Sequence, residues 1–375
     1  MPPRRIDPIA ARAFAVEVIE KLRQGGHEAV WAGGCVRDQL LDRVPLDYDV
    51  ATAARPDAVR NIFGRRNTIA IGAAFGVITV VGSKDTGNVE VATFRSDAEY
   101  IDGRHPVGVT FCGAREDALR RDFTINGLFF DPTTGSVIDY VGGQNDLNEG
   151  VVRAIGDPIM RFEEDHLRIL RAIRFSANFE FPIEPETRKA IVVMAGKGES
   201  VSPERLAAEL RLMFSRHGRG EALRLLVSMN LIGPLFGKRF KRTESFLSST
   251  SDTLDAMEEP NISSAIAVLC YEKPRLAADI CNHLRLSNHE RKLTVWLIEA
   301  VMVLGSVSFS TQQANIPWSV LQPWLAHEWR FQLIDVMKSL AVISLFSTEN
   351  VDWVREQVHR DDADLNPPQL LRGND

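Results

Sequence analysis

The spacing of hydrophobic and polar residues changes every few positions in the first 155 residues of the chain. Residues 9–22 and 36–41 have the spacing of amphipathic helices, and proline opens another helical stretch over 56–63. Short extended stretches, separated in part by glycine-containing turns, cover residues 28–32, 46–51, 68–71, 75–81 and 89–94. This alternation predicts a small α/β or α+β unit.

After Pro158 the hydrophobic spacing is helical almost throughout, so the second half is predicted to be all-α. The predicted helices and amphipathic stretches cover residues 160–175, 184–194, 203–214, 222–229, 263–304 and 318–345. The Ser/Thr-rich segment 244–255 is expected to be a linker or an exposed loop. Five of the six tryptophans follow residue 290, and we expect them to be packing anchors between helices, because no regular pattern places them beside basic residues.

One segment of the first half, residues 95–112, shows no clear period and is expected to form a long loop. Loops of this length are more often functional than incidental.

Composition narrows the class of protein. A chain of 375 residues should hold two or three domains, and 45% hydrophobic with 25% charged residues excludes a mostly disordered chain. The net charge of −6 argues against a uniformly basic surface but allows a local basic groove. Four cysteines without a CxxC pair argue against a disulfide framework or a zinc site. Without a recognisable signal peptide or membrane span, we expect a soluble, cytoplasmic protein with no membrane partner.

The first motif with chemical meaning combines a Gly33-Gly34 turn with Arg37 and the acid pair Asp47 and Asp49. Side chains alternate along a strand, so both acids would point to one face, about 6.5–7 Å apart. That spacing suits two divalent ions, and oxygen ligands favour Mg²⁺. The glycine turn lets backbone amides approach a triphosphate, and Arg37 can add a charged hydrogen bond. The combination predicts a nucleotide and metal site, whereas each element alone would indicate an ordinary turn or strand.

The stretch GGCVRDQLLDRVPLDYDVAT, residues 33–52, resembles the signature of the DNA polymerase β-type nucleotidyltransferases. Within them the chain is similar to the class II tRNA CCA-adding enzymes and the bacterial poly(A) polymerases. Two departures, Gly127 for the usual alanine and Val77 for a frequent threonine, remove no functional group. The resemblance continues through residues 89–97, 120–131, 157–175 and 202–214.

The resemblance implies an α+β fold with three parts. A polymerase β-like head of small sheet and helices would cover residues 1–150. An all-α neck with the nucleotide-selecting helix would cover 151–240, and a helical body and tail for RNA binding 241–375.

The resemblance also assigns roles to residues outside the first motif. Glu90 would be the third catalytic carboxylate, although a solvent-facing strand residue is the alternative. Arg121, Asp122 and Asn126 would bind the nucleotide, because a carboxylate near a helix start can accept the ribose 2′-OH while arginine steadies phosphate or sugar. Asp122 could instead cap its helix, and the two roles are compatible.

Asp165 and Arg168 are three residues apart, which predicts neighbours on one helix face. An ordinary ion pair is the simple interpretation. The alternative uses chemistry: a carboxylate only accepts and a guanidinium only donates hydrogen bonds. Cytosine and adenine each present an amino donor beside a ring-nitrogen acceptor, and guanine and uracil present the reverse. The pair could therefore select CTP and ATP, with Arg171 and Arg174 binding triphosphate or holding Asp165.

With the resemblance, these residues imply a template-independent RNA nucleotidyltransferase that adds CMP and AMP from CTP and ATP to a tRNA 3′ end, with Mg²⁺ as cofactor and no obligate protein partner. Poly(A) polymerase, or one half of a split CC/A system, stays open. The resemblance links the 95–112 loop to A addition, which argues against a CC-only enzyme. A non-catalytic RNA-binding relative is disfavoured by the presence of all three carboxylates. A small-molecule nucleotidyltransferase would not need Asp165 with Arg168.

Overall fold

The computed structural model describes residues 6–45, 47–97, 109–196, 201–237, 239–307, 309–310, 313–314, 316–360 and 365. Most of the expected 95–112 loop therefore lies outside the described residues. The chain forms two compact units, the first of residues up to Ala172 with Phe181–Met194, the second of Ile173–Glu180 with the residues from Ala195 onward. The boundary falls inside helix α7 (Leu167–Phe179).

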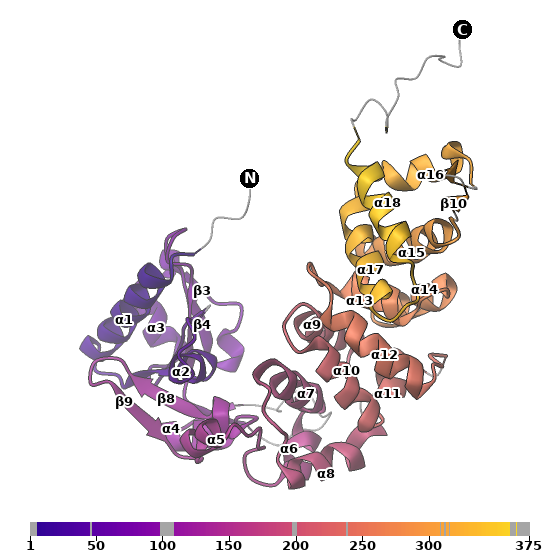
Figure 1. Cartoon of the computed structure of the whole chain (residues 1–375). Coiled ribbons are helices and arrows are strands. Elements are labelled where there is room, and N and C mark those ends of the chain that lie inside the picture. Colours follow the sequence, from indigo (N-terminus) through magenta and orange to yellow (C-terminus); the bar gives the residue numbers. More distant parts are fainter. Residues whose placement is uncertain are drawn as a thin grey trace. The chain divides into compact units, whose positions relative to one another are not determined.

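A seven-stranded mixed sheet forms the framework of the first unit (Figure 1), with strand order β3-β4-β5-β2-β1-β8-β9. Only β2 and β5 pair in parallel, and their register places Asp49 opposite Glu90. The strands are β1 (Ala29–Ala32), β2 (Asp49–Thr52), β3 (Thr68–Ile69), β4 (Val77–Val80), β5 (Val89–Thr93), β8 (Leu128–Asp131) and β9 (Ser136–Asp139). A separate hairpin pairs β6 (Arg95–Asp97) with β7 (Val109–Phe111).

Helices pack on this sheet through its apolar side chains. Helix α1 contacts β1 and β2, α2 contacts β1 and β8, and α3 contacts β4. Phe94 and Phe129 are fully buried and meet edge to face, with ring centroids 5.9 Å apart. The helices are α1 (Pro8–Gln24), α2 (Gly34–Leu40), α3 (Pro56–Phe63), α4 (Ala114–Leu119), α5 (Gly143–Glu149), α6 (Pro158–Glu164) and α8 (Pro185–Met194), with 3₁₀ turns η1 (Arg65–Asn67), η2 (Ala73–Phe75) and η3 (Thr124–Asn126).

The helix predicted over 160–175 is wrong in one respect, because the structure breaks it into α6 and α7. Asp165 is extended, with φ −150° and ψ 104°. Its carboxylate accepts the backbone N–H of Leu167 at 3.1 Å, which gives the next helix its cap. Aspartate competes with the helix for backbone donors in this way, so it favours a helix start over a helix interior.

The second unit is helical apart from two short strands, β10 (Phe309–Ser310) and β11 (Gln313–Ala314), which the all-α prediction did not include. None of the helices in the described ranges has the length and apolar character to cross a bilayer. The helices are α9 (Pro203–Phe214), α10 (Arg219–Ser228), α11 (Ile232–Phe236), α12 (Glu244–Asp255), α13 (Ile262–Leu269), α14 (Pro274–His283), α15 (Asn288–Gly305), α16 (Trp318–Leu325), α17 (Arg330–Val342) and α18 (Thr348–Val358).

The Ser/Thr-rich segment 244–255, predicted as a linker or loop, is helix α12. Its hydroxyls bond back to the helix: Thr250 donates to the Phe246 carbonyl at 2.7 Å and Ser251 to the Leu247 carbonyl at 3.1 Å. These side chains are thereby satisfied without water, and the helix can bury them. Composition alone misled the prediction, because it did not show that the buried residues follow helical spacing.

Candidate active site

The glycine turn predicted at the end of β1 is present and needs glycine. Gly33 has φ +70°, a conformation that L side chains rarely adopt, and a Cβ there would lie 3.0 Å from Nη1 of Arg121. Helix α2 begins at Gly34. On its first turns, Arg37 is buried and donates to Oδ1 of Asn126 at 2.6 Å and to Asp38. Arg37 therefore positions Asn126, and its contact with a triphosphate stays a prediction.

The acid pair lies at the start of β2. The strand predicted over 46–51 begins at Asp49, so Asp47 precedes it. The alternation still holds: Asp47 and Asp49 are exposed, whereas Tyr48 between them is buried against Trp31, with ring centroids 4.8 Å apart. The aromatic contact fixes Tyr48 and leaves both carboxylates on the opposite side of the backbone. Glu90 follows on the adjacent strand, in register with Asp49.

The pKa of Asp49 is strongly raised. Desolvation by the surrounding protein is the largest cause, the carboxylates of Asp47 and Glu90 add to it and Arg121 opposes it, and together they raise the pKa of Asp49 to about 7. Solvent still reaches the Asp49 side chain. A bound cation would reduce the repulsion between these neighbouring carboxylates.

The donor set fits a magnesium ion that arrives with its nucleotide. All donors are carboxylate oxygens, which Mg²⁺ prefers. Across the described ranges, no three side chains of His, Cys, Asp or Glu are grouped closely enough to hold a metal by themselves. Mg²⁺ is commonly bound by one or two carboxylates together with water and substrate phosphates, so Asp47 and Asp49 meet that requirement.

Asp122 forms a second, buried cluster. Its carboxylate accepts from Nε of Arg171 at 2.7 Å, from Nδ2 of Asn126 at 3.2 Å and from the backbone N–H of Phe123 at 2.8 Å. Burial alone would raise its pKa, but the charge of Arg171 and these three hydrogen bonds outweigh burial and lower the pKa to about 2. Asp122 does not cap the η3 turn, whose N-cap residue is Phe123 without a side-chain cap hydrogen bond. Its carboxylate instead binds the Phe123 N–H and the Asn126 side chain.

Acid should destabilise the protein partly through Asp122. The pKa falls from 3.8 in the unfolded chain to about 2 in the folded one, so the ionised carboxylate stabilises the fold above about pH 4. That contribution, about 2 kcal/mol, is lost as the pH falls from about 4 to 2. Urea unfolding should therefore show a smaller loss of free energy between neutral pH and about pH 2.5 for Asp122→Asn than for the wild type. Equal losses in the two proteins would contradict the Asp122 assignment.

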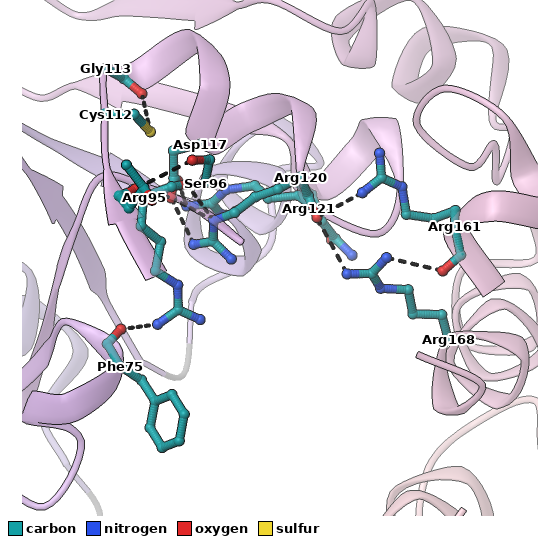
Figure 2. A network of polar contacts seen from close by, with 12 residues as sticks. Phe75, Arg95, Ser96, Cys112, Gly113, Asp117, Arg120, Arg121, Arg161 and Arg168 are labelled. Atoms are coloured by element: carbon teal, nitrogen blue, oxygen red, sulfur yellow. Dashed lines mark hydrogen bonds and ion pairs between the residues drawn. The ribbon is translucent and has the colours of Figure 1, made fainter. Parts of the chain in front are cut away.

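Arg121 is held by Asp117, a residue that sequence reasoning missed. Asp117 is buried and accepts from Nη2 of Arg121 at 3.0 Å and from Nη2 of Arg120 at 2.6 Å (Figure 2). Arg121 also donates to the Asn126 carbonyl at 3.3 Å and lies 5.0 Å from the centroid of the Phe129 ring. The available signal was an acid three and four residues before two arginines, a helical spacing, although both arginines follow the last residue of α4.

Arg168 is also positioned by residues that were not predicted. Its buried guanidinium pairs with Glu164 and donates to the Arg161 carbonyl at 3.0 Å and the Arg120 carbonyl at 3.3 Å (Figure 2). Arg161 donates to the same Arg120 carbonyl at 3.1 Å and also pairs with Glu164. The prediction that Asp165 and Arg168 share one helix face is wrong. Asp165 precedes the helix that carries Arg168 and caps it. A backbone bond from Arg168 N–H to the Asp165 carbonyl, 3.0 Å, keeps the two adjacent.

Arg174 differs from the other predicted residues, because it belongs to the second unit. It is buried, pairs with Glu209 of α9, and stacks on the Phe175 ring at 4.3 Å from the centroid. These contacts join α7 to α9. A direct role of Arg174 with nucleotide stays a prediction.

Comparison with known proteins places this geometry in a family. Residues 29–153 match the poly A polymerase head domain, and residues 180–240 match the probable RNA and SrmB-binding site of polymerase A. The chain is 32% identical over 364 residues to the CCA-adding enzyme of Anoxybacillus flavithermus, covering 92% of this chain and 90% of that enzyme. It is 38% identical over 239 residues to the CCA-adding enzyme of Bacillus subtilis, and the match covers 64% of this chain and 58% of that enzyme.

Solved structures agree. The crystal structure of the Bacillus stearothermophilus CCA-adding enzyme in complex with CTP superposes with a TM-score of 0.73 at 27% identity, over 92% of this chain and 81% of that one. Members of the wider polymerase β-like family generally use metal ions. The chain therefore belongs to the CCA-adding enzymes, nucleotidyltransferases that carry the poly(A) polymerase head domain.

Proposed function

We propose that this CCA-adding nucleotidyltransferase completes the 3′ end of tRNA by adding CMP and AMP from CTP and ATP. The observation that carries the proposal is the acid pair Asp47 and Asp49, exposed on one side of β2 next to Glu90, in a chain that matches a CCA-adding enzyme along 92% of its length. tRNA, CTP and ATP are the proposed partners. Action in the cytoplasm stays a prediction.

Chemistry would take place at the acid pair. The RNA 3′-hydroxyl attacks the α-phosphate of the incoming nucleotide in line, and pyrophosphate leaves. Asp47 and Asp49, with Glu90 beside them, are the residues that would hold Mg²⁺, which when bound supplies positive charge for the attacking oxygen and for the leaving phosphates. The raised pKa of Asp49 supports this assignment, because the charge of Arg121 does not offset desolvation and the neighbouring carboxylates. The Gly33-Gly34 turn leaves room for backbone amides to approach the triphosphate.

Base selection is assigned to Asp165 and Arg168. The carboxylate would accept from the amino group of cytosine or adenine, and the guanidinium would donate to the neighbouring ring nitrogen. Guanine and uracil would leave buried polar groups unpaired, which is how such a site rejects a wrong partner. Three hydrogen bonds to Glu164, Arg161 and Arg120 hold the Arg168 guanidinium, and they use three of its five N–H groups. The remaining two can serve a base.

Arg121, Asp122 and Asn126 are proposed to recognise the ribose, but they have different roles. The Asp122 carboxylate already accepts three internal hydrogen bonds, so its main effect is to fix Asn126. Asn126 is fixed from its other side by Arg37. A pre-organised amide of this kind can bind the ribose 2′-OH without the cost of ordering itself first.

A nucleotide-addition assay distinguishes this function from poly(A) tailing, which the poly A polymerase head match keeps as a second candidate. Purified protein is incubated with tRNA that lacks its 3′ end and, in parallel, with tRNA that ends in CC, with CTP and ATP supplied separately and together. We expect products that stop after three added nucleotides when both are present. Long ladders with ATP alone would indicate tailing, addition of a single A only to CC-ending tRNA would indicate a split system, and no addition would indicate a non-catalytic relative.

A further inference from the structure

An open pocket of about 480 Å³ lies in the second unit, and none of the candidate site residues discussed above lines it. Its walls come from α14, from α15 and from the turn between α16 and α17. The lining side chains combine aromatic rings, aliphatic groups and charges: Ala278, Arg291, Lys292, Val295, Trp296, Glu299, His327 and Trp329.

The aromatic wall of this pocket is a cluster of interacting rings. Trp296 stacks on His327, with centroids 4.4 Å apart and planes 28° apart, and meets Trp329 edge to face at 5.7 Å. The ring of Trp324 also contacts Trp296, with ring centroids 5.7 Å apart. Trp296 and Trp329 are only partly buried. The expectation that these tryptophans are purely packing anchors is therefore incomplete, because two of them line an open pocket.

Positive charge lies beside these rings. Arg291 and Lys292 precede Trp296 on α15 by five and four residues respectively, and Lys292 is exposed. In the described part of the chain neither cation forms an ion pair, and Glu299 is the single acid in the lining. Planar hydrophobic faces next to two cations, with one acid in the lining, match the two chemical parts of a nucleotide, a base and its phosphate.

We propose that this pocket binds an unpaired nucleobase of the RNA substrate, stacked against Trp296 and Trp329, with flanking phosphates near Arg291 and Lys292. The proposal rests on the proposed function in that it takes RNA as the substrate. It adds a contact site outside residues 180–240, the segment that matches an RNA-binding family model. A protein partner would also use aromatic anchors, but the pair of cations favours a polyanion.

Three variants of the full-length protein test the pocket. Trp296→Ala removes the stacking face, Trp296→Phe retains an aromatic ring, and Lys292→Glu reverses an exposed charge without affecting packing. The matched control is Trp318→Ala, which removes a tryptophan that is 38% exposed and lies outside the pocket. The dissociation constant for tRNA lacking its 3′ end is measured by fluorescence anisotropy over a range of salt concentrations, and KM and kcat for CMP addition are measured in parallel.

Trp296→Ala should raise the dissociation constant and the KM for tRNA about tenfold, because one base-stacking contact is worth about that factor, with the effect on KM rather than kcat. Trp296→Phe should retain most of the affinity. Lys292→Glu should weaken binding and reduce the slope of log affinity against log salt by about one or more. Trp318→Ala should bind as the wild type does.

Wild-type affinity in both Trp296→Ala and Lys292→Glu would overturn the proposal and leave a protein partner as the occupant. If Trp296→Ala does not fold, the salt slope of Lys292→Glu decides, because that side chain is exposed. Failure of the proposed function is distinguishable: the wild type would then add no nucleotides to tRNA, whereas the anisotropy measurement still reports whether RNA binding depends on the pocket.

Discussion

Replacement of Asp49 by asparagine is expected to lower CMP incorporation by a factor of about a thousand or more. The amide cannot carry the negative charge that holds a divalent ion against the attacking and leaving oxygens, and electrostatic contacts of this kind typically contribute about that much. Incorporation of labelled CTP into tRNA lacking its 3′ end measures the effect. Asp57→Asn, at an exposed aspartate on α3, is the matched control and should retain wild-type activity. Residual activity above about a tenth in Asp49→Asn would contradict the assigned role.

The same variant should not lose stability, which separates a functional residue from a structural one. The pKa of Asp49 rises from 3.8 to about 7 on folding, so the folded state favours the protonated form. Its contribution is favourable below about pH 4 and is lost as the pH rises through about 7. In the presence of a chelator, Asp49→Asn should therefore unfold at a higher temperature than the wild type above about pH 7, and the difference should vanish near pH 4.

Replacement of Arg171 by methionine is expected to have the largest effect on stability, about 3 kcal/mol in the free energy of unfolding at neutral pH. Arg171 holds the buried Asp122 carboxylate with two N–H groups, both 2.7 Å from Oδ2. Without it, a buried charge loses its main partner, and that costs more than the contact itself contributes. Urea denaturation measures the change, with Arg188→Met, at an exposed arginine on α8, as the control.

A second substitution tests the reason for that loss. In the Arg171→Met background, Asp122→Asn removes the stranded charge and should restore part of the stability, so the two changes should be non-additive. Strict additivity, or a loss below about 0.5 kcal/mol for Arg171→Met alone, would show that Arg171 does not neutralise Asp122.

Sequence periodicity predicted most elements of the first unit and failed where a polar side chain changed the local backbone. Helix α3 and strand β5 follow directly from proline and β-branched patterns. The break at Asp165 did not, because apolar spacing continues through it, and only the cap that its carboxylate makes reveals a new helix start. The parallel pairing of β2 with β5, which aligns Asp49 with Glu90, is a non-local contact that no short pattern encodes.

The candidate site was predictable where the chemistry lies in consecutive residues and unpredictable where it depends on a distant partner. The alternation of Asp47, Tyr48 and Asp49 could be deduced from strand geometry. The long-range partners could not, because Arg37 reaches Asn126 and Arg171 reaches Asp122 only once the chain has folded. The local pairs that Asp117 and Glu164 form with nearby arginines have helical spacing and were available in the sequence. The pairing of Arg174 with Glu209, 35 residues later, is another long-range contact that the sequence did not reveal, and the role of Arg174 with nucleotide stays a prediction.

Calorimetric binding of the four nucleoside triphosphates, in Mg²⁺ and then in chelator, tests the central claim most directly. In this account Asp47 and Asp49 hold the metal, and Asp165 and Arg168 select the base. We therefore expect CTP and ATP to bind in the presence of Mg²⁺. We also expect GTP and UTP to bind at least about tenfold more weakly, and binding of all four nucleotides to be lost in chelator. Equal affinity for the four nucleotides, or CTP binding that does not depend on Mg²⁺, would contradict the account.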